Sequence, residues 1–257
     1  MAPNSSSPLK FFILTFVLST PFLLVGAFTG IQVMEGIPIS ALMAVCPVSA
    51  AVILTRCERG SVRGLLERTF DFQRIRRKIW YIPILLLMPA ILLLSYLWMR
   101  LAGSPLPAPQ FSIFADTAMS AAFFGGAIVE ELGWTAYVLE PLQERSSALK
   151  AALLIGTVWA IWHIVPFAQA HRSTNWIAWQ CFNTVALRVL MVWIYNNSGK
   201  SVFAAILFHT TINASDFLFP NNGSHFSPRV AGLITAGTAA LVTAIRRPKT
   251  IAESHCK

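Results

Sequence analysis

The chain has 257 residues, of which 55% are hydrophobic and only 12% are charged, and its mean hydropathy is +0.61. Soluble globular domains carry about 25% charged residues, so this composition excludes an ordinary water-soluble fold. The formal net charge of +9 lies mostly in short segments between apolar stretches, which indicates anionic membrane lipid rather than nucleic acid as the partner.

Eight apolar segments are long enough to cross a membrane, which takes about 20 residues of helix. They cover residues 11–30, 37–55, 79–99, 111–139, 149–169, 176–196, 200–219 and 228–245. The gaps between them are too short to fold as a separate soluble domain. The sequence therefore predicts an all-α fold, a polytopic membrane helix bundle with about eight transmembrane helices, which forms a single membrane domain over residues 1–257.

The segment 56–78 decides the predicted orientation, because it holds eight lysine and arginine residues. Basic loops stay on the cytoplasmic side of a membrane. This rule places both termini in the cytoplasm. The leucine and phenylalanine residues within 56–78 leave two alternatives open, an interfacial helix or a solvated loop.

Five ionisable side chains lie inside four of the predicted helices. They are Glu130, Glu131, His163, Arg188 and His209. A charge at the bilayer centre costs roughly 3 kcal/mol, so each such residue is a candidate functional group. Glu130, His163 and His209 lie about 9 to 14 residues from the predicted cytoplasmic ends of their helices, or roughly 14 to 21 Å. Groups at one depth on neighbouring helices can converge on one site.

The spacing of these residues indicates which helix faces they occupy. His209 and Asn213 are four residues apart and therefore share one face. Glu130 and Glu131 differ by about 100° around the helix, so one carboxylate can enter the site while the other braces a neighbouring helix. Close packing of that helix is predicted at its three glycines, Gly125, Gly126 and Gly133.

This set of side chains is suited to the hydrolysis of an amide bond. A carboxylate and an imidazole can activate a water molecule, and a second imidazole with an amide can stabilise the oxyanion on the attacked carbonyl. Alternatively, Glu130, His163 and His209 can hold a divalent metal such as zinc that activates the water. Membrane histidines also serve simply as hydrogen-bonding groups between helices, and the residues alone leave these alternatives open.

Three stretches resemble one known family. Residues 130–137 read EELGWTAY, residues 159–166 read WAIWHIVP and residues 209–215 read HTTINAS. They are similar to the EExxxR, FxxxH and HxxxN/D motifs of the CPBP group of intramembrane proteases, which includes the type II CAAX prenyl endopeptidases and the bacterial Abi proteins. The resemblance covers about residues 115–219, which we interpret as the catalytic core.

The resemblance implies an eight-helix bundle around a water-accessible cavity, and by analogy with the family we expect a bacterial plasma membrane as its location. Within it, Glu130 would act as the general base on water and His163 would help to position that water. His209 and Asn213 would supply the oxyanion site. Glu131 would have a supporting role, because the family pairs it with an arginine four residues further on.

The chain departs from the family pattern at two of these positions. Thr135 stands where the family has arginine, and Trp159 stands where it has phenylalanine. An unpaired buried carboxylate at Glu131 would be costly. We therefore expect Arg188, an otherwise unexplained cation in the sixth segment, to supply the missing partner of Glu131.

The sequence thus predicts an intramembrane endopeptidase of the glutamate or metallo type, acting on a membrane-associated peptide such as a prenylated or bacteriocin-like one. The alternative is a non-catalytic immunity or binding protein of the same fold, which Thr135 favours. A transporter with a proton relay is a third reading, but the chain shows no internal repeat of its helices.

Overall fold

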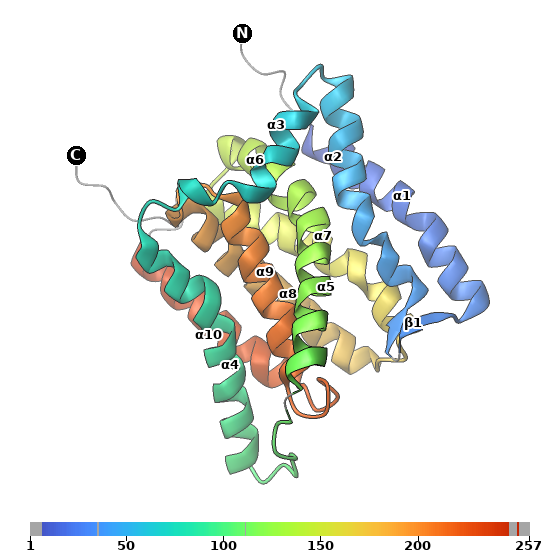
Figure 1. Cartoon of the computed structure of the whole chain (residues 1–257), viewed down its shortest axis with the longest axis vertical. Helices are drawn as coiled ribbons and strands as arrows, with labels where there is room; N and C mark the ends of the chain where they lie inside the picture. Colours follow the sequence, from blue (N-terminus) through green and yellow to red (C-terminus); the bar gives the residue numbers. More distant parts are fainter. Residues whose placement is uncertain (1–6, 35, 111, 247–250, 252–257) are drawn as a thin grey trace.

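The computed structural model describes residues 7–34, 36–110, 112–246 and 251 of the chain. The elements within them, in chain order, are α1 (Pro8–Thr29), β1 (Gln32–Met34), β2 (Ile37–Pro38), η1 (Ile39–Val45), α2 (Cys46–Cys57), α3 (Val62–Glu67), η2 (Arg68–Phe70), η3 (Phe72–Arg74), η4 (Lys78–Trp80), α4 (Tyr81–Leu101), α5 (Ile113–Glu131), η5 (Leu132–Tyr137), α6 (Leu139–Arg145), α7 (Ala148–Gln169), α8 (Thr174–Asn197), α9 (Val202–Leu218) and α10 (Pro228–Arg246). Apart from the β1–β2 hairpin, these elements are helical (Figure 1), so the predicted all-α class is confirmed.

Seven helical stretches of the described residues are long and apolar enough to cross a membrane. They are Pro8–Thr29, Ile39–Cys57, Lys78–Leu101, Ile113–Arg145, Ala148–Gln169, Thr174–Asn197 and Pro228–Ile245. The remaining predicted segment forms α9, which is apolar but shorter, with 17 residues. The protein is therefore a multi-pass integral membrane protein.

Two predicted helices differ from the simple picture of one straight span. The segment predicted at 37–55 enters through the hairpin and the 3-10 helix η1 before α2 begins. The segment predicted at 111–139 continues to Arg145, because α5 passes into the π-helical turn η5, where the Val138 N–H donates to the Gly133 carbonyl 3.2 Å away. Such a wide turn is frequent at functional sites. Here it follows immediately after Glu131.

The four helices that carry the predicted site residues all begin at a serine N-cap. Ser112, Ser147, Ser173 and Ser201 each accept a hydrogen bond from the backbone N–H three residues further on. A serine cap of this kind stabilises a helix by about 1 kcal/mol. The caps fix where α5, α7, α8 and α9 start, and hence the register of the side chains along them.

Helix α8 lies at the centre of the bundle, packed between α7 and α10 and against α9, while α9 also packs against α5 and α4. Gly156 on α7 allows the closest approach, because a Cβ atom there would lie 3.0 Å from the Cβ of Arg188 and 3.1 Å from the Cα of Val185 on α8. A backbone this close brings side chains of α7 and α8 into direct contact.

The glycine prediction for the fourth segment is only partly correct. A Cβ atom at Gly133 would lie 2.6 Å from that of Pro47, so this glycine does allow α2 to pack closely. Gly125 and Gly126, in contrast, have no side chain or foreign backbone within 4 Å of such a Cβ atom. A Cβ atom at either position would enter open space among the described residues, so the expectation of close packing there was wrong.

Apolar side chains face outward along the bundle, as expected of a surface in contact with lipid. Exposed examples on α1, α4 and α10 are Leu9, Ile13, Val17, Ile82, Leu86, Leu93, Leu97, Leu233 and Leu241. In the basic segment 56–78, Leu66, Phe70 and Phe72 are exposed as well. The short helices of this segment therefore favour the interfacial alternative.

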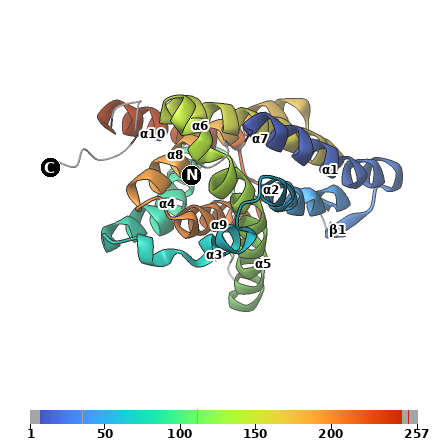
Figure 2. The same cartoon turned by 90° about the horizontal axis from the view of Figure 1, so that it is seen from above.

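The bundle has two distinct ends. Figure 1 shows α3 and α6 at the top, and the connection from α9 to α10 at the bottom. Seen from above in Figure 2, α5 projects at the edge of the bundle. The basic segment 56–78 and the loops that follow α7 and α9 thus lie at opposite ends.

Candidate active site

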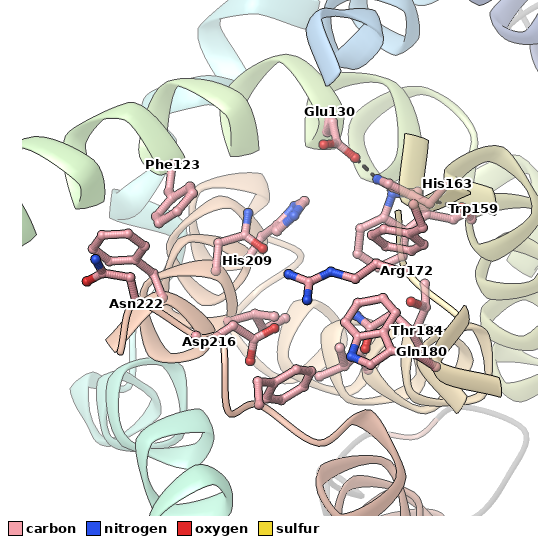
Figure 3. A pocket seen from close by; sticks show the side chains of 18 residues that line it. Phe123, Glu130, Trp159, His163, Arg172, Gln180, Thr184, His209, Asp216 and Asn222 are labelled. Carbon is pink, nitrogen blue, oxygen red and sulfur yellow. Dashed lines mark hydrogen bonds between the residues drawn. The ribbon is translucent and has the colours of Figure 1, made fainter. Parts of the chain in front are cut away.

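A cavity of about 300 Å³ is lined by α5, α7, α8 and α9 and by the loops after α7 and α9. Four of the five predicted site residues line it, namely Glu130, His163, His209 and Asn213 (Figure 3). Glu131 does not line the cavity. The two adjacent carboxylates therefore point in different directions, as their 100° separation on the helix predicts.

Glu130 presents one carboxylate oxygen to the protein and leaves the other available. Its Oε2 accepts a hydrogen bond of 2.8 Å from the indole Nε1–H of Trp159, drawn as a dashed line in Figure 3. No described residue donates to its Oε1, and no described lysine or arginine forms an ion pair with it. Glu130 is nevertheless largely buried, with 7% of its surface exposed. This places an oriented carboxylate with one unused oxygen at the cavity wall.

Glu131, in contrast, is fully buried and surrounded by donors. Arg188 binds it in a bidentate manner, with Nη1 2.9 Å from Oε2 and Nη2 3.1 Å from Oε1. The Nδ1 atom of His209 lies 3.0 Å from Oε1. Bidentate guanidinium–carboxylate pairs are among the strongest charged hydrogen bonds. This carboxylate joins α5, α8 and α9 into one unit.

The replacement of the family arginine by Thr135 is thereby explained. The Thr135 hydroxyl donates to Oε2 of Glu131, one helical turn away, and Arg188 reaches the same carboxylate from α8. The predicted pairing of Arg188 with Glu131 is confirmed. The cation is retained at the site, but it comes from a neighbouring helix instead of from the helix of Glu131.

Trp159 connects these two carboxylate environments. Its indole N–H binds Glu130, and the Cζ atom of Arg188 lies over its ring, 4.3 Å from the centroid. The ring of His209 approaches it edge-on with a centroid distance of 5.2 Å. Sequence analysis assigned this tryptophan no role in the site. A phenylalanine at this position could stack in the same way but could not donate to Glu130.

The hydrogen bonds of the two histidines define which ring nitrogen faces the cavity. Nδ1 of His163 lies 2.9 Å from the backbone carbonyl of Trp159. Because a carbonyl oxygen only accepts, Nδ1 carries the proton, and Nε2 of a neutral ring keeps its lone pair. Nδ1 of His209 likewise donates to Glu131. The Nε2 atom is therefore the one left for a ligand in both rings.

A second cavity of about 220 Å³ shares Glu130 and His163 with the first. Its other walls come from the hairpin, η1 and the end of α7, and they include Ile37, Met43 and Pro166. These walls are mainly apolar. The Glu130–His163 pair therefore forms part of the wall of both cavities.

The three predicted metal ligands carry suitable atoms, since each histidine binds a protein acceptor through Nδ1, as metal-ligating histidines do. Among the described residues, however, no group of three or more His, Cys, Asp and Glu side chains is arranged to hold a metal ion. We assign no catalytic step to a metal, and zinc stays a prediction that chelation tests.

Three further residues of the cavity were not predicted as site residues. Asp216 lines the cavity together with Arg172 and Trp176. Asp216 had a usable signal, because positions 209, 213 and 216 follow the spacing of one helix face. Arg172 had none, since it lies in the loop between α7 and α8.

Comparison with known proteins adds independent information about the same region. Residues 112–215 match the family model described as type II CAAX prenyl endopeptidase Rce1-like. A protein of Methanococcus maripaludis named CAAX prenyl protease 2 is 29% identical over 233 residues, which span 82% of this chain and 84% of that protein. All five predicted site residues fall inside the matched segment.

Proposed function

Because this chain belongs to the Rce1-like type II CAAX prenyl endopeptidase family, we propose that it is an intramembrane endopeptidase in which Glu130 and His163 activate water. The observation that carries the proposal is the contrast between the two adjacent glutamates. Glu131 is neutralised by Arg188, whereas Glu130 faces the cavity, which His163 and His209 also line, with an unused oxygen. Of the two glutamates, only Glu130 is free to exchange a proton with a ligand.

In the proposed reaction, Oε1 of Glu130 and Nε2 of His163 accept hydrogen bonds from one water molecule. Glu130 removes a proton from this water as its oxygen attacks the carbonyl carbon of the peptide bond. The Trp159 N–H holds the carboxylate in the required orientation through Oε2. The proton on Glu130 then passes to the departing amine, which completes the cleavage and restores the carboxylate.

The negative charge that develops on the carbonyl oxygen needs hydrogen-bond donors. Asn213 lines the cavity and can donate from its amide nitrogen. His209 can donate from Nε2 only when its ring is protonated at both nitrogens, because Nδ1 already donates to Glu131. Glu131 stabilises that charged ring. The proposed role of Glu131 is therefore to position and charge His209.

The two cavities, which share Glu130 and His163 as wall residues, suit a substrate that has both a polar peptide and an apolar group. The polar cavity would take the peptide, and the apolar cavity would take a prenyl chain or a large apolar side chain of a bacteriocin-like peptide. The scissile bond would then lie beside Glu130 and His163.

The direct test is cleavage by the purified protein of a prenylated CAAX peptide and a panel of unmodified peptides. We expect cleavage by the wild type and a loss of at least about a hundredfold in Glu130→Gln and in His163→Ala, the usual range for losing a general base. Glutamine can still accept from Trp159, so the fold is retained. Cleavage by Glu130→Gln at the wild-type rate would refute the proposal.

The same experiment separates the alternatives. A chelator that abolishes cleavage and whose effect is reversed by zinc would assign water activation to a metal. A wild type that binds a peptide of the panel but cleaves none of them would favour the non-catalytic immunity or binding protein. The pairing of Arg188 with Glu131 supports an active enzyme. The lack of an arginine at position 135 favoured the non-catalytic protein, but α8 supplies the missing cation.

We also propose that the polar cavity opens away from the cytoplasm of a bacterial plasma membrane. The basic segment 56–78 would face the cytoplasm, and the loops that line the cavity, with Arg172 and Asn222, belong to the other end of the bundle. In a chain whose native cysteines are replaced by serine, a cysteine at Asn222 should react with a membrane-impermeant maleimide in intact cells. One at Arg63 should react only after lysis. The reverse pattern would invert the orientation.

A further inference from the structure

The part of the polar cavity formed by the loop after α7, the start of α8 and the end of α9 has no role in the proposed water activation. Arg172, Trp176, Gln180 and Asp216 line it. In Figure 3 the guanidinium of Arg172 extends into the cavity between α9, which carries His209 and Asp216, and α7. These residues present unpaired charge and unpaired hydrogen-bonding groups to whatever enters.

Arg172 is held in place without being neutralised. Its backbone N–H donates to the Phe167 carbonyl 3.1 Å away, in the turn where His171 has a φ of 56°. Its Cζ atom lies 4.9 Å from the centroid of the Trp176 ring. A cation–π contact orients a guanidinium but leaves its charge and most of its N–H donors available. No described carboxylate forms an ion pair with Arg172.

Acceptors without donors lie in the same part of the cavity. Oδ1 of Asp216 and Oε1 of Gln180 are both buried, and no described group donates a hydrogen bond to either of them. Buried polar atoms of this kind cost free energy unless a ligand or solvent pairs with them. Because Asp216 and Arg172 share a cavity without forming an ion pair, the cavity offers a cation and two acceptors separately.

The complementary ligand has a carboxylate for the cation and N–H donors for the acceptors. A peptide has both, since its backbone N–H groups donate and its C-terminus or an acidic side chain supplies the carboxylate. We propose that Arg172 binds a carboxylate on the C-terminal side of the scissile bond, while Asp216 and Gln180 accept backbone N–H groups of the same stretch. This inference rests on the proposed function, because it assumes that the ligand of this cavity is a peptide.

The test uses three versions of the prenylated CAAX peptide that differ only at the end. One has a free C-terminal acid, one has a C-terminal amide, and one has the amide with a glutamate as its last residue. We expect the wild type to favour the acid over the amide by roughly tenfold to a hundredfold, as a charged hydrogen bond does. If the amide peptide that ends in glutamate is cleaved as well as the free acid, the site also accepts a carboxylate from a side chain.

The variant Arg172→Gln should lose this discrimination, so that the acid and the amide differ by less than about twofold. A matched control is Arg229→Gln, which removes the same charge from an exposed arginine that also lies over a tryptophan ring, 5.6 Å from the centroid of Trp179, but does not line the cavity. We expect Arg229→Gln to keep the preference for the acid. An equal effect of both variants would show a general charge effect and would overturn the proposal.

Binding to the Glu130→Gln protein, measured with fluorescent acid and amide peptides, separates this inference from the proposed function. Tighter binding of the acid that disappears in Glu130→Gln/Arg172→Gln would support the carboxylate site even if the wild type cleaves nothing. Equal binding of acid and amide, or no binding of any peptide, would overturn it. Cleavage of both peptides at equal rates by the wild type would overturn the inference and leave the endopeptidase proposal standing.

Discussion

The two ends of the bundle are both rich in charged residues, but they use them differently. At the basic end, Asp71 receives the backbone N–H of Phe203 at 3.0 Å and the Ser201 hydroxyl at 2.8 Å, and Arg68 donates to the carbonyl of Lys200 at 2.7 Å. Charged side chains there bind neutral groups of other elements of the chain. At the cavity end, Arg172 and Asp216 share a space without pairing.

This difference separates support of the fold from recognition of a ligand. A charged group whose partners all belong to the chain stabilises the fold, and its removal should change the free energy of unfolding. A charged group that faces a cavity without a partner should affect binding or cleavage. Glu131 lies between these two cases, because its partners are internal but one of them, His209, lines the cavity.

The largest effect should follow Arg188→Ala, which leaves Glu131 as a buried carboxylate without its cation. Breaking a buried ion pair on one side costs about 3 to 5 kcal/mol, and we also expect cleavage to be lost because His209 loses its support. The measurement is thermal unfolding in detergent, together with the peptide cleavage assay.

A double variant sharpens this prediction. Arg188→Ala/Thr135→Arg returns the cation to the position where the family carries it, and we expect part of both stability and activity to return. A double variant that is as unstable as Arg188→Ala would contradict the assignment of Arg188 as the replacement for that arginine.

At the basic end, Asp71→Ala should destabilise the protein by about 1.5 to 3 kcal/mol, the range for hydrogen bonds to a charged group. Asp71 binds the first turn of α9 and lies 3.6 Å from Nε of Arg68. The turnover of the folded fraction should be unchanged. Asp71→Asn, which can still accept from Phe203, is the matched control and should lose less. A change in KM with normal stability would contradict the structural role.

At the cavity end, Trp159→Phe should lower kcat roughly tenfold, or about 1.4 kcal/mol, because Glu130 loses its N–H donor while an aromatic ring is retained. Trp193→Phe is the control, since Trp193 packs edge-on against Trp80 and lines neither cavity. The control should keep its kcat. Equal kcat values for the wild type and Trp159→Phe would remove Trp159 from the proposed mechanism.

The smallest effect should come from Arg63→Ala, which breaks an ion pair with Glu67 on the surface of α3. The two side chains are 89% and 62% exposed, so solvent and salt screen their attraction. We expect a change in unfolding free energy of less than about 0.5 kcal/mol. A larger loss, measured by the same thermal unfolding assay, would show that charges at this end contribute even without burial.

The sequence by itself determined the parts of this protein that depend on local chemistry. All eight apolar segments became helices, because the length and hydropathy of a span are properties of the segment alone. Helix periodicity also separated the directions of Glu130 and Glu131. Because an isolated buried charge is costly, Glu131 was expected to have a cationic partner, and Arg188 was the one lysine or arginine inside a predicted span rather than near its end.

Only the tertiary structure decided which groups from different helices meet. The hydrogen bond from Trp159 to Glu130 depends on how α7 packs beside α5, and the cation of Arg188 over the Trp159 ring depends on the close approach at Gly156. The place of Arg172 in the cavity depends on a turn after α7. These contacts arise from side-chain directions and interhelical distances, which no single segment of the sequence specifies.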